Sequence, residues 1–128
     1  MNLNERSLKN LVGVHPDLVQ VVKLAAQHTK LDFIVTEGIR TKARQAELVK
    51  AGASRTMKSR HLTGHAVDLA ATVGGTVRWD WPLYSQLAET MKAAAKDLSI
   101  AIEWGGDWTS FKDGPHFQLP FSAYPAEE

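Results

Sequence analysis

The stretch that most constrains how this chain folds is SRHLTGHAVDLA, residues 59–70, which sets two histidines and an aspartate among small and apolar residues. His61 and His65 have the four-residue spacing of a metal-binding pair on one helix. Thr63 and Gly64 lie between them, and a β-branched residue followed by glycine disfavours a helix at that point. The glutamate that usually follows the first histidine of such a pair is leucine here. The sequence therefore argues against a helical metal site.

The alternative is a loop at 59–64 followed by a strand at 65–70. Side chains alternate between the two faces of a strand. One face then carries His65, Val67 and Leu69, and the other carries Ala66, Asp68 and Ala70. We therefore expect Asp68 to enter a site between two small alanines, His61 to fold back over it from the loop, and His65 to point away.

A second polar cluster lies in KDGPHFQL, residues 112–119. His116 begins an alternating run there, and Asp113 precedes it across a Gly-Pro turn. The chain has no cysteine, so a metal ion would have to be held by histidine or carboxylate side chains. Two histidines and one carboxylate, with a fourth position for water, is the usual arrangement of a hydrolytic zinc site, and a further carboxylate can serve as general base. Taken singly, each of these residues has an ordinary structural explanation; together, His61, Asp68, Asp113 and His116 predict a metal centre.

Composition limits the remaining possibilities. The chain has 128 residues and a formal net charge of +1, which is too balanced to indicate nucleic-acid binding and gives a nuclease little support. Its length predicts a single domain over residues 1–128. We find neither the apolar segment of a signal peptide nor an apolar run near the ~20 residues of a membrane span, so we expect synthesis in the cytoplasm and no stable membrane insertion.

The order of predicted elements indicates an α+β fold with a small antiparallel sheet and helices packed against it. Apolar residues at helical spacing, together with capping residues, predict helices at 15–30, 41–52 and 79–99. Short β-rich runs predict strands at 32–38, 65–70, 100–104 and 116–119, with a Gly-Gly turn inside 72–77.

Two separated patterns resemble the double signature of the zinc peptidoglycan peptidases. S-x-H-x-x-G-x-A-x-D is matched by SRHLTGHAVD at 59–68, and [D/E]-x-x-H is matched by DGPH at 113–116. TEGIRTKARQAEL at 36–48 is similar to a strand-loop-helix segment of that family. WGGDW at 104–108 is similar to a segment found in its endolysin branch. The resemblance covers about residues 10–120.

This resemblance implies a LAS-type zinc peptidase fold and a set of roles. Zn²⁺ would be held by His61, Asp68 and His116. Asp113 would be the catalytic base, and Arg40 would steady the developing oxyanion near the scissile carbonyl. Many D,D-peptidases carry glutamate as the base, so aspartate favours the L-alanyl-D-glutamate endopeptidases of phage endolysins.

Three further residues are assigned to substrate binding: Gln45, Ser59 and Trp104. The structural alternatives are a solvated helix face, a serine that shapes its loop or orients the neighbouring histidine, and an aromatic core residue. A basic patch precedes the site, and we expect it to be a solvated loop: Arg55, Lys58 and Arg60.

The leading hypothesis is a monomeric phage or prophage enzyme that cuts the L-alanyl-D-glutamate bond of peptidoglycan stem peptides. Without a signal peptide, it would reach periplasmic peptidoglycan after release through a holin. One alternative is a D-alanyl-D-alanine carboxypeptidase. An alternative of another class is a non-catalytic, zinc-containing wall-binding protein, against which the presence of Asp113 and Arg40 argues.

Overall fold

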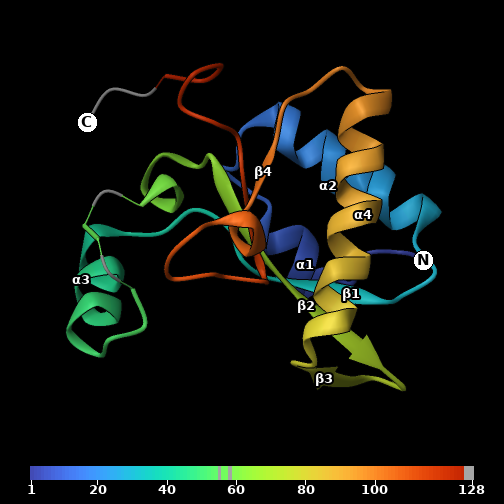
Figure 1. Ribbon diagram of the computed structural model, residues 1–128, viewed down its shortest axis with the longest axis horizontal. Helices are drawn as coiled ribbons and strands as arrows, with labels where there is room; N and C mark the ends of the chain where they lie inside the picture. The colour runs from blue at the N-terminus through green and yellow to red at the C-terminus, as the bar shows by residue number, and fades with distance from the viewer. Residues whose placement is uncertain (55, 58, 126–128) are drawn as a thin grey trace.

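Strand β2 (Ala66–Val73) is the central element of the computed structural model. The residues that the structure describes are 1–54, 56–57 and 59–125. β2 pairs antiparallel with three other strands: β1 (Phe33–Glu37), β3 (Thr76–Arg78) and β5 (His116–Gln118). A short strand, β4 (Glu103–Trp104), pairs with β5, so the sheet order is β1-β2-β5-β4 with β3 beside β2 (Figure 1). Every other strand is therefore attached to β2 directly or through β5.

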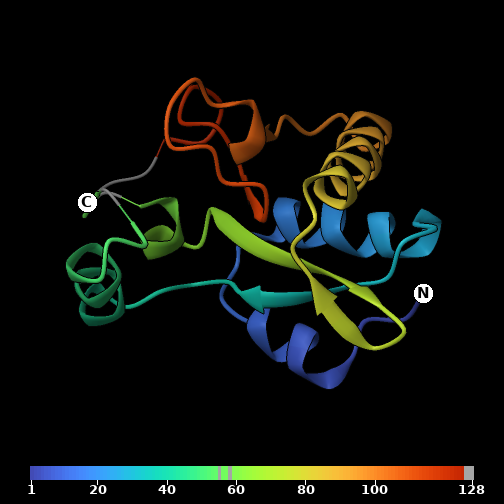
Figure 2. The ribbon, with the colours of Figure 1, turned by 60° about the horizontal axis from the view of Figure 1, so that its bottom comes forward.

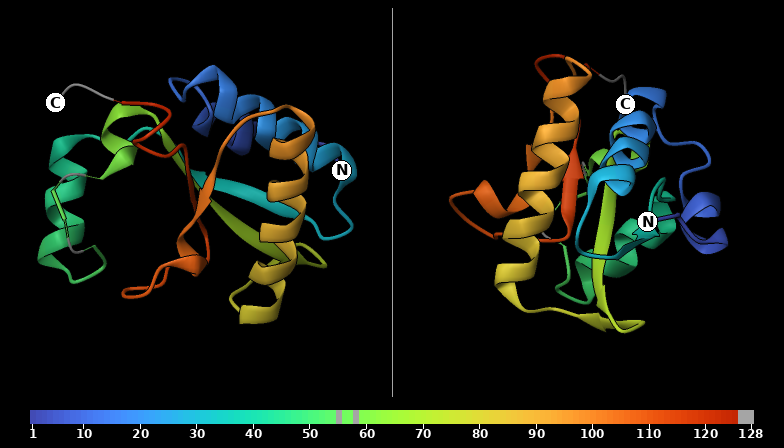
Figure 3. Two further views of the ribbon diagram at one scale, coloured as in Figure 1. Left: turned by 45° about the horizontal axis from the view of Figure 1, so that its top comes forward. Right: turned by 90° about the vertical axis from the view of Figure 1, so that its right-hand side faces the viewer.

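The helices lie on both sides of this sheet. Their bounds are α1 (Glu5–Asn10), α2 (Pro16–His28), α3 (Lys42–Lys50) and α4 (Trp81–Asp97), with 3₁₀ turns η1 (Arg60–Thr63) and η2 (Gly105–Asp107). α2 and α4 pack side by side, whereas α1 lies on the other side of the sheet from α4 (Figures 2 and 3). α3 stands at the opposite end of the molecule from α4 (Figure 3). In the described part of the chain, no helix combines the length and the apolar character that crossing a membrane requires.

The two faces of β2 differ as strand alternation predicts. Val67, Leu69 and Ala71 are buried in the hydrophobic core. They face a layer of side chains from α2 and α4, among them Leu18, Val22, Leu87 and Met91. Burying such an aliphatic side chain contributes roughly 1.5–3 kcal/mol, so this face holds the sheet against the helices. The opposite face, which carries Asp68, is left for the candidate site.

Helix α1, which the sequence did not predict, protects the free edge of β1. The Ser7 hydroxyl accepts a hydrogen bond from the Val35 amide at 2.9 Å. The Asn10 side-chain amide donates to the carbonyls of Val35 and Thr36, at 2.9 and 3.2 Å. An edge strand with unpaired backbone groups invites pairing with other chains, so these side chains replace the missing neighbour.

The α+β prediction is confirmed, and the main helices and strands lie where the sequence predicted them. The predicted strand at 100–104 is shorter than expected and begins only at Glu103. Ser99 adopts a left-handed conformation with φ of 57°, which turns the chain sharply after α4 and delays strand pairing.

The predicted solvated basic loop is wrong for Arg60, whose side chain is only 3% exposed. Its guanidinium donates to the Leu119 carbonyl from Nε and Nη2, at 3.1 and 2.9 Å, and to the Tyr124 carbonyl at 2.6 Å. It also lies 4.1 Å from the centre of the Phe121 ring. Arg60 therefore fastens the C-terminal segment to the loop before β2. Arg55 and Lys58 lie outside the described residues.

Gly64 ends η1, and we expect it to tolerate no side chain. Its φ is +75°, and an added Cβ would lie 2.5 Å from the Gly13 carbonyl oxygen. Gly64→Ala should cost about 3 kcal/mol or more, from left-handed strain plus a backbone clash. Gly74 has φ of +59° and open space, so Gly74→Ala should cost only about 1 kcal/mol. Urea denaturation measures both losses, and equal losses would contradict the role of the close approach.

Candidate metal centre

Three neighbouring strands place three polar residues in one row. A register shift between Val35 and Glu37 in β1 brings Glu37 opposite Asp68 in β2, and Asp68 is in turn opposite His116 in β5. Directly opposed residues of antiparallel strands project to the same face. The sheet thus gathers Glu37, Asp68 and His116 on the face that turns away from the core.

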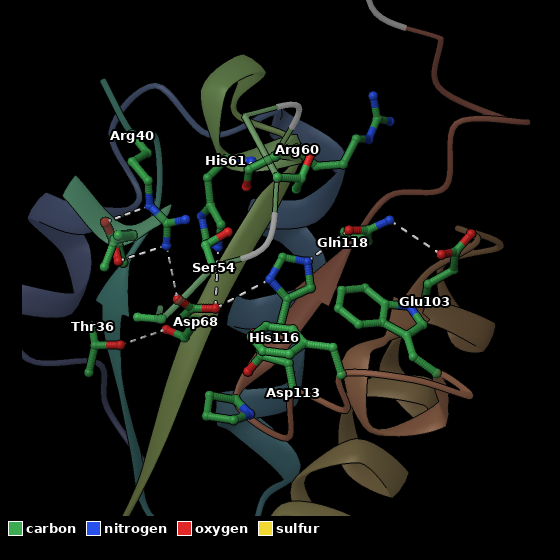
Figure 4. A pocket seen from close by; sticks show the side chains of 18 of the residues that line it. Thr36, Arg40, Ser54, Arg60, His61, Asp68, Glu103, Asp113, His116 and Gln118 are labelled. Atoms are coloured by element: carbon green, nitrogen blue, oxygen red, sulfur yellow. Dashed lines mark hydrogen bonds and ion pairs between the residues drawn. The ribbon is translucent and has the colours of Figure 1, made fainter. Parts of the chain in front are cut away.

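His61 completes a compact group with two members of this row. Its Nε2 lies 3.2 Å from Asp68 Oδ1, and His116 Nδ1 lies 3.4 Å from the same oxygen (Figure 4). The ligand atoms of His61, Asp68 and His116 all lie within 4.8 Å of one another. The structure therefore brings together the three residues that the sequence predicted as metal ligands.

Carbonyl oxygens fix the orientation of both imidazole rings. His61 Nδ1 lies 2.7 Å from the Gly38 carbonyl oxygen, and His116 Nε2 lies 2.7 Å from Gln118 Oε1. Because a carbonyl oxygen only accepts, each of these ring nitrogens carries the proton. Nε2 of His61 and Nδ1 of His116 are then left facing the Asp68 carboxylate. Two imidazole nitrogens and one carboxylate oxygen are a donor set that suits Zn²⁺.

The charges of this group support one another. Burial alone would raise the pKa of Asp68, but its hydrogen bonds with His116 and His61 outweigh burial and hold that pKa well below its usual range. Burial would lower the pKa of His116, whereas its hydrogen bond to Asp68 raises it above the ordinary value. The negative charge of Asp68 thus lies between two ring nitrogens, where it would also attract a cation.

Asp113 stands beside this group in the same cleft. Burial raises the pKa of its carboxyl group, and the nearby negative charge of Asp68 raises it further. A carboxyl group with a raised pKa is suited to carry a proton during a reaction. A bound cation would counteract that shift.

The turn WGGDW positions Asp113. The Asp113 amide donates to the Gly105 carbonyl at 3.0 Å, and the Trp104 indole N–H donates to the Gly114 carbonyl at 2.7 Å. A Cβ on Gly105 would collide with the Asp113 backbone and approach the His116 side chain within 3.1 Å. Glycine is therefore needed where η2 packs beneath the loop that carries Asp113.

This packing also decides the position of two tryptophans. Trp104, expected to contact substrate, is only 8% exposed and is not among the described residues that line the cleft. Trp108 lines the cleft instead, with its ring centre 5.1 Å from that of His116. Trp104 is a buried residue that supports the loop carrying Asp113, in agreement with the alternative assignment of Trp104 to the core.

Arg40 is held by three neighbours. Its Nε and Nη2 donate to the two carboxylate oxygens of Glu37 at 2.8 Å each, its Nη1 donates to Gln45 Oε1 at 2.7 Å, and its Nη2 donates to Asp68 Oδ2 at 3.4 Å. These bonds use four of the five N–H groups of a guanidinium. The register shift in β1 aligns Glu37 with the site, and such a shift leaves no signal in residue spacing.

Gln45 and Ser59 support other site residues. Gln45 is fully buried, and its amide also donates to the Ser54 hydroxyl at 2.8 Å and to the Thr56 carbonyl. Gln45 is not among the described residues that line the cleft. Ser59 lines the cleft, and its hydroxyl accepts from the His61 amide at 3.2 Å, which caps η1.

The cleft around these groups has a volume of about 730 Å³. His65 is not among the described residues that line it. Its ring lies 5.4 Å from the ring of His15 at the start of α2, and its Nδ1 lies 2.7 Å from the Thr63 hydroxyl. The outward direction predicted for His65 is therefore what the structure has.

The fold and this group of side chains define a candidate metal centre, and comparisons with known proteins identify the class of protein. A sequence profile of the phage L-alanyl-D-glutamate peptidase family matches residues 1–119. The chain therefore belongs to that family, which confirms the resemblance drawn from the two motifs.

Individual relatives agree with this assignment. The crystal structure of the Serratia marcescens L-Ala D-Glu endopeptidase ChiX has 52% sequence identity and a TM-score of 0.92, covering 98% of this chain and 95% of that one. The L-alanyl-D-glutamate peptidase of Escherichia phage T5 is 33% identical over 85% of this chain and 82% of its own length. That of Listeria phage A118 is 44% identical over 73% of this chain, which spans only 32% of that protein.

His61 and Asp68 point into the cleft and His65 points away from it, and this difference gives a test of the metal centre. We expect His61→Ala and Asp68→Ala to weaken Zn²⁺ binding at least about a hundredfold, because each removes a direct donor. His65→Ala should bind Zn²⁺ like the original chain, since its ring faces α2. Calorimetric titration of metal-free protein measures all three, and an equal loss in His65→Ala would restore the helical pair.

Proposed function

We propose that this chain is a zinc-dependent endopeptidase that hydrolyses the L-alanyl-D-glutamate bond of peptidoglycan stem peptides. The observation that carries the proposal is the convergence of His61, Asp68 and His116 within 4.8 Å, with the Asp113 carboxyl group in the same cleft. Membership of the phage L-alanyl-D-glutamate peptidase family supports the choice of bond. As a phage or prophage protein, the enzyme would reach periplasmic peptidoglycan by holin-type release and act there as a monomeric domain.

The donor set is what a catalytic zinc ion requires. His61 Nε2, His116 Nδ1 and an oxygen of Asp68 would hold the ion, and three protein ligands leave a position for water. Zinc held in this way would lower the pKa of a bound water and would polarise a carbonyl group. The two acceptors behind the rings, the Gly38 carbonyl and the Gln118 amide oxygen, would keep the other ring nitrogens directed toward the ion.

Asp113 is proposed to move the proton. Its carboxylate accepts a proton from the attacking water and then donates it to the amine of the leaving D-glutamyl residue, so that one carboxyl group acts as base and then as acid. Water supplies OH to the L-alanyl carbonyl carbon and H to the leaving nitrogen, which balances the hydrolysis. Arg40 has one N–H group beyond those bonded to Glu37, Gln45 and Asp68, and we assign it to the developing oxyanion.

The bond that is cut distinguishes this proposal from its alternatives. Purified Gram-negative peptidoglycan, digested with the zinc-loaded chain, should release peptides that begin with D-glutamate, as measured by mass spectrometry of the soluble fragments. Addition of a chelator should stop the release. Free D-alanine with intact stem peptides would instead identify a carboxypeptidase, and no fragments at all would favour a wall-binding protein.

Asp113→Asn should keep the metal and lose the reaction. The amide preserves the shape of the side chain but cannot accept the proton, so kcat should fall by about 10²–10⁴-fold while Zn²⁺ affinity stays near that of the original chain. Asp107→Asn is the matched control, because Asp107 lies in the same segment but is exposed and paired with Lys92 at 2.6 Å. Full activity in Asp113→Asn would remove Asp113 from the mechanism.

A further inference from the structure

The two histidines of the candidate metal centre are oriented by different kinds of acceptor. His61 donates to a backbone carbonyl, that of Gly38, which no substitution of a side chain removes. His116 donates to the side chain of Gln118, whose amide in turn donates to Glu103 Oε2 at 3.3 Å. We propose that Gln118 is a positioning residue that directs Nδ1 of His116 toward the metal, and that Glu103 keeps the Gln118 amide in the required orientation. This inference rests on the proposed zinc site.

Strand register brings these three residues together. His116 and Gln118 are two apart on β5 and therefore share a face. Gln118 is opposite Ala66 of β2 on one side and Glu103 of β4 on the other. The small Ala66 side chain leaves room for the Gln118 amide to lie between His116 and Glu103. Gln118 is buried, at 8% exposed, so water competes little for its amide.

Glu103 matters because an amide has two different ends. With Oε1 toward His116, the amide accepts the Nε2 proton and leaves Nδ1 unprotonated for a metal ion. A reversed amide would present N–H to Nε2, which favours the opposite tautomer. The Glu103 carboxylate only accepts, so it binds the nitrogen end of the amide and opposes that reversal.

The choice of glutamine over a carboxylate also follows from the charges nearby. Asp68 and Asp113 already place two carboxyl groups beside His116. A third one in contact with Nε2 would add negative charge to a buried site, which is costly unless paired. An amide orients the ring and adds no charge.

The test uses zinc affinity and a proton signal rather than activity. Gln118→Met keeps the side-chain length but has no carbonyl acceptor, and we expect Zn²⁺ to bind about 10–100-fold more weakly, as for other partners of metal-binding histidines. Glu103→Gln should weaken binding by a smaller factor. In the zinc-loaded protein, the Nε2 proton resonance of His116 should exchange with water faster in both variants, because its hydrogen bond is lost or loosened.

An exchange of the two side chains provides the rescue. Gln118→Glu combined with Glu103→Gln again presents an oxygen to His116. The amide now at position 103 donates to the carboxylate at 118 and pairs the charge moved there, so zinc affinity should return to within a few-fold of the original. Gln86→Met, on the exposed face of α4, is the control for the loss of a glutamine elsewhere.

The outcomes separate this inference from the proposed function. If the unsubstituted protein fails to bind zinc, the proposed metal centre itself is wrong. If the unsubstituted protein binds zinc and Gln118→Met matches it in zinc affinity and in the proton exchange of His116, only the proposed role of Gln118 is wrong. If Gln118→Met does not fold, Glu103→Gln and the exchange variant decide, and an exchange variant no tighter than Glu103→Gln contradicts the proposal.

Discussion

The structure of the site depends on one carboxylate. Asp68 contacts both imidazoles through Oδ1 and the guanidinium of Arg40 through Oδ2. Without this negative charge, His61 and His116 would lose the carboxylate that they share, which is costly in a buried setting, whereas Arg40 would remain paired with Glu37. The same negative charge, set beside two ring nitrogens, would also attract a metal cation.

Asp68 holds that position because alternate residues of β2 point to opposite faces of the sheet. Val67, Leu69 and Ala71 pack in the core with α2 and α4, and Asp68, on the opposite face, lines the cleft. A shift of one residue in register would bury Asp68 in the core and expose Val67 and Leu69. The large apolar area on the core side thus fixes the direction of the carboxylate, so the stability of the fold and the geometry of the site share one cause.

Parity is also why much of the site could be predicted from the sequence. The direction of His65 away from the cleft followed from alternation alone, and the Thr-Gly pair ruled out the helix that would have reversed it. The burial of Arg60 did not follow, because its partners are carbonyl groups of a C-terminal segment distant in sequence. Trp104 was misplaced for a similar reason, since the partner of its indole N–H is the Gly114 carbonyl in another loop. Local pattern thus predicts which face a side chain takes but not which distant backbone it meets.

The packing of the loop around Asp113 fits an aspartate at this position rather than a glutamate. Aspartate is one methylene shorter than glutamate, so its loop must bring the backbone closer to His61, Asp68 and His116 for the carboxyl group to reach the same place. The structure achieves this by packing the loop directly on Gly105, whose carbonyl accepts from the Asp113 amide and whose missing side chain permits the approach. The glycine of WGGDW and the aspartate of DGPH therefore act as one unit, although the sequence separates them. An alanine at 105 would displace Asp113, because its Cβ would meet the Asp113 carbonyl oxygen.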